Sequence, residues 1–154
     1  MVAELHKTNT NLYETDYNLW VLETVAKLKN QDLDALDWEN LIEEVEDLSR
    51  RDKHKLQSLL NHIFEHLLLI VYWQAEFIRN QGHWERKILN FRLQLLQVLE
   101  DNPSLRNYAR DYLVEGYKKG RKLAAKHSQL PLSKFPEEPI ATLEQVLDED
   151  WLPQ

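Results

Sequence analysis

The stretch from Leu67 to Trp73 is apolar on every side of a helix, and this feature most restricts how the chain can fold. It completes a longer helical segment, Leu56–Trp73, whose first half is amphipathic. A soluble protein tolerates an apolar helix of this kind only where other helices enclose it. The run is far too short to cross a bilayer, which takes roughly 20 apolar residues. The segment therefore predicts the central helix of a helical bundle.

Composition agrees with this prediction. The chain has 154 residues, of which 43% are apolar and only three are Gly, so it can bury a core and favours helix over strand. It contains no Cys, which excludes disulfides and thiolate chemistry and fits a reducing cytosol. The N-terminus lacks an apolar h-region, so no signal peptide is expected. We predict an all-α fold with a single domain over residues 1–154, of which residues 1–12 are loosely ordered.

Apolar residues at helical spacing predict an up-and-down bundle of four to five helices. Thr15 or Asp16 is expected to cap the first helix and Asp37 the second. A break or kink is favoured at residues 49–52, although no Gly or Pro forces one. Gly82 is expected to end the third helix as its C-cap. The predicted helices cover residues 16–30, 38–48, 52–82, 84–100 and 103–127.

Two glycines, Gly116 and Gly120, lie four residues apart on the apolar face of the last of these helices. Each costs about 1 kcal/mol of helix propensity. The lysines and arginines around them exclude a lipid-facing role, so we expect another helix or an aromatic ring to approach closely there.

Residues 129–154 form an extended, proline-rich segment that we call the strap. Thr142 followed by Gln145 is a capping-box pattern that predicts one short helix, Leu143–Leu147. Apolar residues recur through the strap too often for a solvated linker, and Trp151 would leave a large apolar surface in water. We therefore expect the strap to pack along the bundle, with its acidic residues near the basic fifth helix.

One local pattern suggests chemistry. His62, Glu65 and His66 match the H-x-x-E-H signature of zinc enzymes, in which two histidines bind the metal and the glutamate activates water. Glu44, on the preceding helix, is the best candidate for a third metal ligand. The alternative, which we favour, is that both histidines lie at an interface and bond to carboxylates of a neighbouring helix, that Glu65 lies in solvent, and that Glu44 pairs with an arginine. The arginines considered for that pair are Arg50, Arg51 and Arg92.

Charge is segregated along the chain. Residues 32–52 carry nine acids against two arginines, whereas residues 106–126 carry seven bases against two acids. A net charge of −7 argues against general affinity for nucleic acid. The tyrosines beside the basic residues, Tyr108, Tyr112 and Tyr117, lie on the apolar stripe and are not free to stack on bases. A solvated basic face, or one that complements acidic residues of the same chain, is favoured.

Several spaced motifs resemble the mostly cyanobacterial family catalogued as domain of unknown function 29. The resemblance covers roughly residues 13–152 and implies an all-helical bundle without a known activity. One position departs from the family pattern, because Leu69 stands where the family has a Lys after H-L-L. The motifs are Asn40–Glu44, His66–Leu68, Trp84, Pro103–Leu105, Tyr117, Phe135–Pro136 and Pro139.

These observations favour a small cytoplasmic protein that binds another macromolecule, expected to be a protein, without catalysis. The alternative is a metal-binding bundle or metal-dependent enzyme that uses Glu44, His62 and His66. We therefore assign no catalytic, cofactor-binding or metal-ligating residue and expect no cofactor. No membrane association is expected, nucleic acid is disfavoured, and homo-oligomerisation stays open.

Overall fold

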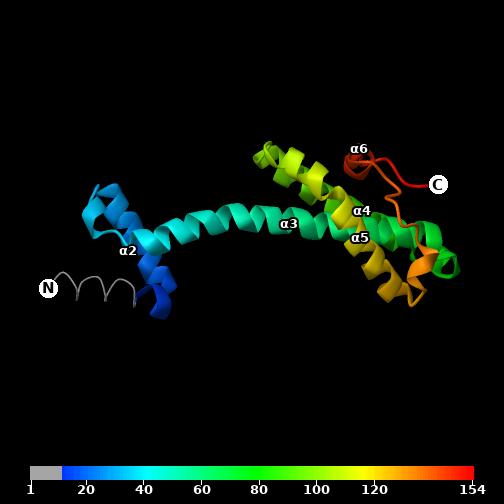
Figure 1. Ribbon diagram of the computed structural model, residues 1–154, viewed down its shortest axis with the longest axis horizontal. Helices are drawn as coiled ribbons and strands as arrows, with labels where there is room; N and C mark the ends of the chain where they lie inside the picture. Colours follow the sequence, from blue (N-terminus) through cyan, green and yellow to red (C-terminus); the bar gives the residue numbers. More distant parts are fainter. Residues whose placement is uncertain (1–11) are drawn as a thin grey trace. The chain divides into compact units, whose positions relative to one another are not determined.

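The computed structural model describes residues 12–154, and helices dominate this part of the chain (Figure 1). No strand occurs between residues 12 and 154, so the all-α prediction is confirmed. Loose order was expected for residues 1–12, and residues 1–11 lie outside the described part of the chain. The chain divides into two units: unit 1 ends at Arg51, and unit 2 spans Asp52–Gln154. The single domain over residues 1–154 stays a prediction.

Unit 1 consists of a short helical segment at residues 12–15, helix α2 (Tyr17–Lys29), the 3-10 turn η1 (Leu33–Ala35) and the beginning of helix α3 (Trp38–Tyr72). Asp16 caps α2 by accepting a hydrogen bond from the backbone N–H of Leu19 at 3.0 Å. Asp37 precedes α3 and accepts from the backbone N–H of Asn40 at 3.4 Å. Both N-caps were predicted from the sequence, because a short acidic side chain can satisfy the unpaired amides of a first helical turn.

Helix α3 continues through residues 49–52, so the favoured break there is wrong. Arg50 lies within 3.0 Å of Asp47 and 3.6 Å of Glu46, one turn earlier on the same helix. Such pairs support a helix, and no Gly or Pro opposes it.

In unit 2, residues 52–72 of α3 are followed by α4 (Gln74–Asp101) and α5 (Leu105–Ser128). The corner between α3 and α4 is Trp73, whose ring stacks on Trp84 at 5.7 Å between centroids. The prediction that Gly82 ends the third helix is therefore wrong. Gly82 lies within α4 and does not take a positive φ. The corner lies at Trp73, where an aromatic ring packs, and not at a flexible residue.

The centre of unit 2 is the predicted apolar run. Leu67, Leu68 and Leu69 are fully buried, Ile70 is buried, and Val71 is half-buried. The four residues from Leu67 to Ile70 belong to one core cluster that also takes side chains from α4, α5 and the strap. Each fully buried side chain of this size contributes roughly 1.5–3 kcal/mol through the hydrophobic effect. The prediction of a central enclosed helix holds for this segment of α3.

The closest approach predicted on α5 occurs at Gly120. A Cβ built on Gly120 would lie 2.6 Å from the Cβ of Phe64 and 2.7 Å from the carbonyl oxygen of Asn61. Gly116 is less constrained, because its nearest neighbour would be the ring of Tyr112 at 3.1 Å. Gly120 is thus the position where α5 packs directly on the backbone of α3.

The strap packs against the helices of unit 2, to which it belongs. It contains the 3-10 turn η2 (Leu132–Lys134) and helix α6 (Leu143–Leu147), which begins with the expected capping box of Thr142 and Gln145. Its apolar anchors are buried: Phe135, Ala141, Leu143, Val146 and Leu147.

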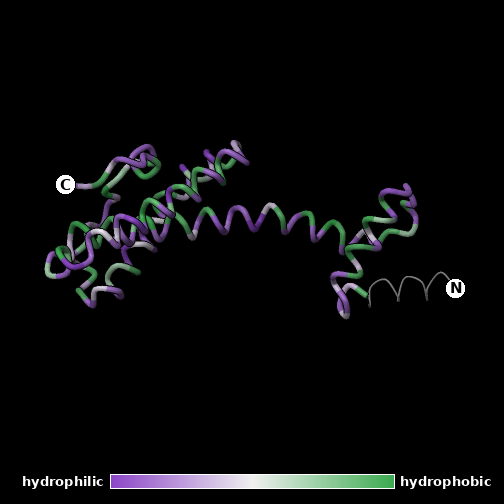
Figure 2. Tube along the Cα trace, turned by 180° about the vertical axis from the view of Figure 1, so that it is seen from behind, coloured by the Kyte–Doolittle hydropathy of each residue, from purple (hydrophilic) through white to green (hydrophobic). Residues whose placement is uncertain are grey.

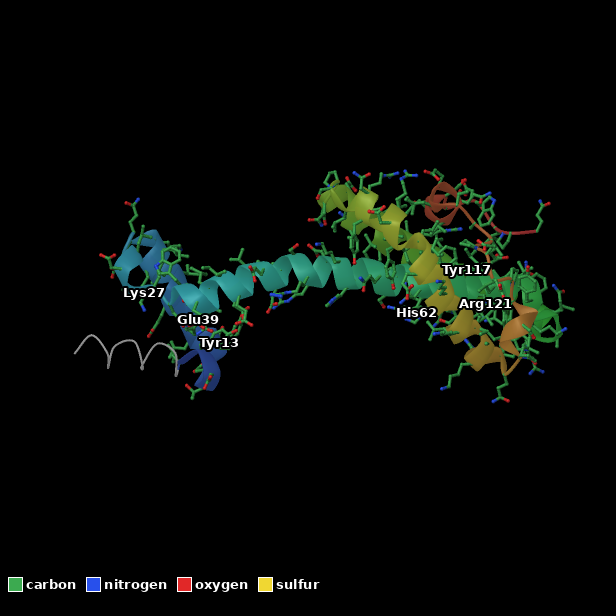
Figure 3. The ribbon with its side chains drawn as sticks, viewed as in Figure 1. Tyr13, Lys27, Glu39, His62, Tyr117 and Arg121 are labelled. Atoms are coloured by element: carbon green, nitrogen blue, oxygen red, sulfur yellow. The ribbon has the colours of Figure 1, made fainter. Side chains whose placement is uncertain are left out.

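Long polar side chains of α4 and α5 hold the strap backbone. Arg92 is itself buried and donates to the carbonyl oxygens of Val146, Trp151 and Gln145 at 2.8, 2.7 and 3.2 Å. Figure 3 shows Tyr117 and Arg121 on α5, where they donate to carbonyl oxygens of the η2 region of the strap. These side chains thus supply donors to six carbonyl oxygens of the strap without a sheet.

Candidate functional site

Unit 1 leaves most of its large apolar side chains in solvent. Of the large apolar side chains between residues 12 and 51, only those of Trp20 and Leu36 are buried. Figure 2 shows hydrophobic positions recurring along both α2 and the beginning of α3. Isolated exposed apolar residues are ordinary, whereas a concentration of this size is typical of interaction surfaces. The exposed residues are Tyr17, Leu19, Leu22, Val25, Leu28, Leu33, Trp38, Ile42, Val45 and Leu48.

Part of this surface forms a groove between α2 and α3, which we call the apolar groove. Its walls follow a helical period on both sides: Val21, Val25 and Leu28 on α2, and Leu41, Val45 and Leu48 on α3. The groove also includes Tyr17, Trp20, Thr24, Glu44 and Arg51. It encloses about 210 Å³, below the roughly 300–1,000 Å³ of pockets that hold small molecules. Its size suits the side chains of another protein.

The polar end of the groove is built around Glu44. Tyr13 and Tyr17 donate their hydroxyl hydrogens to the two carboxylate oxygens of Glu44 at 2.6 and 2.7 Å. These hydrogen bonds lower the pKa of Glu44, and the bond to Glu44 raises the pKa of Tyr13 to about 12. Tyr13, Tyr17 and Trp20 also contact one another ring to ring. The acidic end of the groove is therefore ordered and ionised at neutral pH.

The H-x-x-E-H pattern on α3 forms a different arrangement from a zinc-enzyme site. Glu65 is buried, contrary to the expectation that it lies in solvent. His62 Nδ1 donates to one carboxylate oxygen of Glu65 at 3.0 Å, and His127 of α5 donates to the other at 3.1 Å. His66 Nδ1 donates to the carbonyl oxygen of His62 at 2.8 Å. Nδ1 of each ring thus faces a protein acceptor. For His62 and His66 that acceptor lies on α3 itself, so the expected bonds to carboxylates of a neighbouring helix are wrong.

Burial opposes the ionisation of Glu65, but the hydrogen bonds from His62 and His127 outweigh it and hold the pKa of the carboxyl below its ordinary value. Burial lowers the pKa of His66, although its hydrogen bond to the His62 carbonyl acts in the opposite direction. Phe91 of α4 lies against the rings of His62 and His66, at 5.4 and 5.6 Å between centroids. The cluster consequently joins three helices of unit 2 around an ionised carboxylate.

The proposed third metal ligand does not join this cluster. Glu44 belongs to unit 1, where Tyr13 and Tyr17 occupy its two oxygens. Among residues 12–154, no three His, Asp or Glu side chains are arranged to hold a metal ion. The arginines considered for Glu44 have other roles: Arg50 pairs with Asp47, and Arg92 holds the strap, whereas Arg51 acts on Glu44 only through its charge.

The basic face of α5 also has structural roles. Lys119 lies over the ring of Tyr112 at 5.6 Å, Arg121 holds the strap, and Arg110 pairs with Glu144 of α6 at 2.9 Å. Tyr112 and Tyr117 are buried, so they do not present rings for bases to stack on. None of the helices between residues 12 and 154 combines the length and apolar character of a membrane span.

Sequence reasoning missed two features of these sites. The apolar residues of α2 and early α3 have the helical spacing of a buried stripe, and nothing in that spacing indicates that they stay exposed. His127 was not connected with Glu65, because the two residues are 62 positions apart.

Comparison with known proteins agrees with the motif resemblance. No curated protein and no solved structure matches the chain. Residues 12–152 match a family described as a domain of unknown function, DUF29, and the match covers nearly the whole chain. The chain therefore belongs to the family Domain of unknown function DUF29.

Proposed function

We propose that the protein is a non-catalytic binding module that holds a helix of a protein partner in the apolar groove of unit 1. The observation that carries the proposal is the exposure of the groove walls: the side chains of Val45 and Leu48 are 58% and 57% exposed although they line a shaped apolar surface. Leaving such a surface in water forgoes roughly 25 cal/mol for each Å² of apolar area that a partner would cover.

The shape of the groove favours a helical partner. Its two walls carry apolar side chains at positions i, i+4 and i+7 of each helix. Side-chain ridges of one helix pack into grooves of this kind on others, and amphipathic helices are commonly recognised in this way. A cytoplasmic location accompanies the proposal, supported by the absence of cysteine.

The proposal is tested by selecting binders to the full chain from a display library of random helical peptides. Selected peptides should lose at least tenfold in affinity for a Val45→Ser, Leu48→Ser double variant. Both side chains are exposed, so the variant should keep its circular dichroism and melting curve. Ile78, which is 95% exposed on α4 of unit 2, provides the matched control, and Ile78→Ser should not affect binding. Peptides that bind the groove variant and the parent equally well would overturn the proposal.

A further inference from the structure

The net charge of the chain is confined to unit 1. Residues 12–51 contain 11 acids and four bases, which gives −7, the net charge of the whole chain. Residues 52–154 contain 14 acids and 14 bases and are neutral overall. The apolar groove therefore lies in the acidic part of an otherwise balanced protein.

The acids lie on the elements that build the groove. Glu44 lines the groove itself, and Glu39, Glu43 and Glu46 are exposed on the same helix, α3. Asp32 and Asp34 are exposed in the connection between α2 and α3. Figure 3 marks Glu39 on the first turn of α3.

The four bases among residues 12–51 offset the negative charge of these acids only in part. Arg50 pairs with Glu46 and Asp47. Arg51 lines the groove, and Lys27 and Lys29 lie in the last turn of α2. The surroundings of the groove thus keep an excess of negative charge.

We propose that the partner helix of the apolar groove is cationic, with lysines or arginines flanking its apolar ridge. This inference rests on the proposed function and specifies the chemistry of the partner. Opposite charge around an apolar contact raises the association rate and excludes wrong partners. A second copy of unit 1 would bring a net charge of −7 against a net charge of −7, so the two copies would repel each other. The phosphates of nucleic acid or of an anionic membrane would be repelled in the same way.

Three synthetic helical peptides test the inference. All carry the same leucines at i, i+4, i+7 and i+11, and their remaining positions are rich in Lys, Gln or Glu. Binding to the full chain is measured by isothermal titration calorimetry at low and at moderate salt. The Lys peptide should bind at least tenfold more tightly than the Gln peptide and should weaken as salt screens the charges, whereas the Glu peptide should bind least.

Charge-reversal variants locate the effect. Glu39→Lys with Glu43→Lys should lower the affinity for the Lys peptide at least tenfold and raise the affinity for the Glu peptide. The matched control is Glu137→Lys with Glu138→Lys, which makes the same change of charge at exposed positions of unit 2 and should leave both affinities unchanged.

The outcomes separate this inference from the proposed function. Equal binding of the Lys and Gln peptides, lost in the Val45→Ser, Leu48→Ser variant, would overturn the cationic partner and leave the groove as the binding surface. Absence of binding by all three peptides would overturn both proposals. Sedimentation completes the test: a dimer that dissociates in the groove variant would identify the occupant as a second copy and overturn the cationic partner. A last measurement exposes the free monomer to a soluble paramagnetic agent. If the methyl groups of the groove are protected from the agent, the chain covers its own groove, and the proposal of a cationic partner is overturned too.

Discussion

Gly120 of α5 lies so close to Phe64 of α3 that a Cβ at residue 120 would come within 2.6 Å of the Cβ of Phe64. The carbonyl oxygen of Asn61 and the amide nitrogen of Glu65 lie within 3.0 Å of the same point, so backbone as well as side chain would have to move. We expect Gly120→Ala to lower the free energy of unfolding by about 1–3 kcal/mol through overpacking. Urea denaturation measures the difference.

The other two glycines are matched controls for this substitution. Gly82 lies within α4 with no atom near the position of an added Cβ, so Gly82→Ala should stabilise the protein by about 0.5–1 kcal/mol. The change in the free energy of unfolding for Gly116→Ala should lie between those of the other two variants, because the nearest contact of its added Cβ is the ring of Tyr112. A Gly120→Ala protein that is more stable than the parent would show that α5 is not packed directly on α3.

Arg92 is expected to matter more for stability than any surface ion pair of the strap. It is buried, and its loss would leave the carbonyl oxygens of Val146 and Trp151 without their donor. The carbonyl oxygen of Gln145 would lose one of its two donors and keep the backbone N–H of Asp148. Arg92→Met should therefore cost about 3 kcal/mol or more, since each buried acceptor left unsatisfied costs about 1–3 kcal/mol.

The control for Arg92 is the exposed pair between Arg110 and Glu144, at 2.9 Å. Arg110→Gln should leave the urea midpoint almost unchanged, because solvent and salt screen an exposed ion pair. Equal losses in the two variants would mean that charge, and not the buried hydrogen bonds, attaches the strap.

Local chemistry explains which parts of this fold the sequence predicts well. The caps at Asp16 and Asp37 and the capping box of Thr142 and Gln145 form within a single turn, so a short stretch of sequence determines them. The run from Leu67 to Ile70 is apolar on all sides and has to be enclosed wherever it lies. Neither inference needs a distant residue.

The features that were missed depend on residues far apart in the chain. Trp73 forms the corner between α3 and α4 where it stacks on Trp84, and no Gly or Pro marks that position. Glu65 is buried, and its carboxyl stays ionised because His62 and, 62 residues later in the chain, His127 donate to it. Hydrophobic periodicity shows which side of α2 is apolar, but it does not show whether the chain itself or a partner covers that side. The groove residues Val25 and Val45 have core-like spacing and are nevertheless exposed.

Two leucines of α3 distinguish the core from the groove. Leu68 is fully buried in unit 2, so Leu68→Ala should lower the free energy of unfolding by about 2–5 kcal/mol. Leu48 is 57% exposed in unit 1, so Leu48→Ala should change it by no more than about 0.5 kcal/mol. A large loss of stability in Leu48→Ala would show that the groove is a covered part of the core.

The buried histidine of unit 2 should make stability depend on pH. Burial lowers the pKa of His66 below its ordinary value of 6.5, so the folded protein keeps the ring neutral at a pH where the unfolded chain takes up a proton. The unfolded state then binds more protons, and stability falls as pH decreases below about 6.5. Well above pH 6.5 the titration of His66 causes no loss of stability. The loss begins near pH 6.5 and grows as the pH falls, until the pH reaches the folded-state pKa of His66. Glu65, whose pKa is also lowered, contributes in the same direction only in more acidic solution, below its ordinary value of 4.5.

His66→Gln isolates this contribution, because Gln does not titrate and its amide can still donate to the His62 carbonyl. The charged and titratable groups that act on His66 are Glu65 and His62 on α3, Lys87 on α4 and His127 on α5, and all of them remain in the variant. Urea midpoints measured from pH 7.5 to pH 5.5 should fall less steeply for His66→Gln than for the parent. His83→Gln, at an exposed position of α4, should keep the parent's slope. If His66→Gln and the parent lose stability in parallel, protonation of His66 is not what couples unfolding of unit 2 to pH.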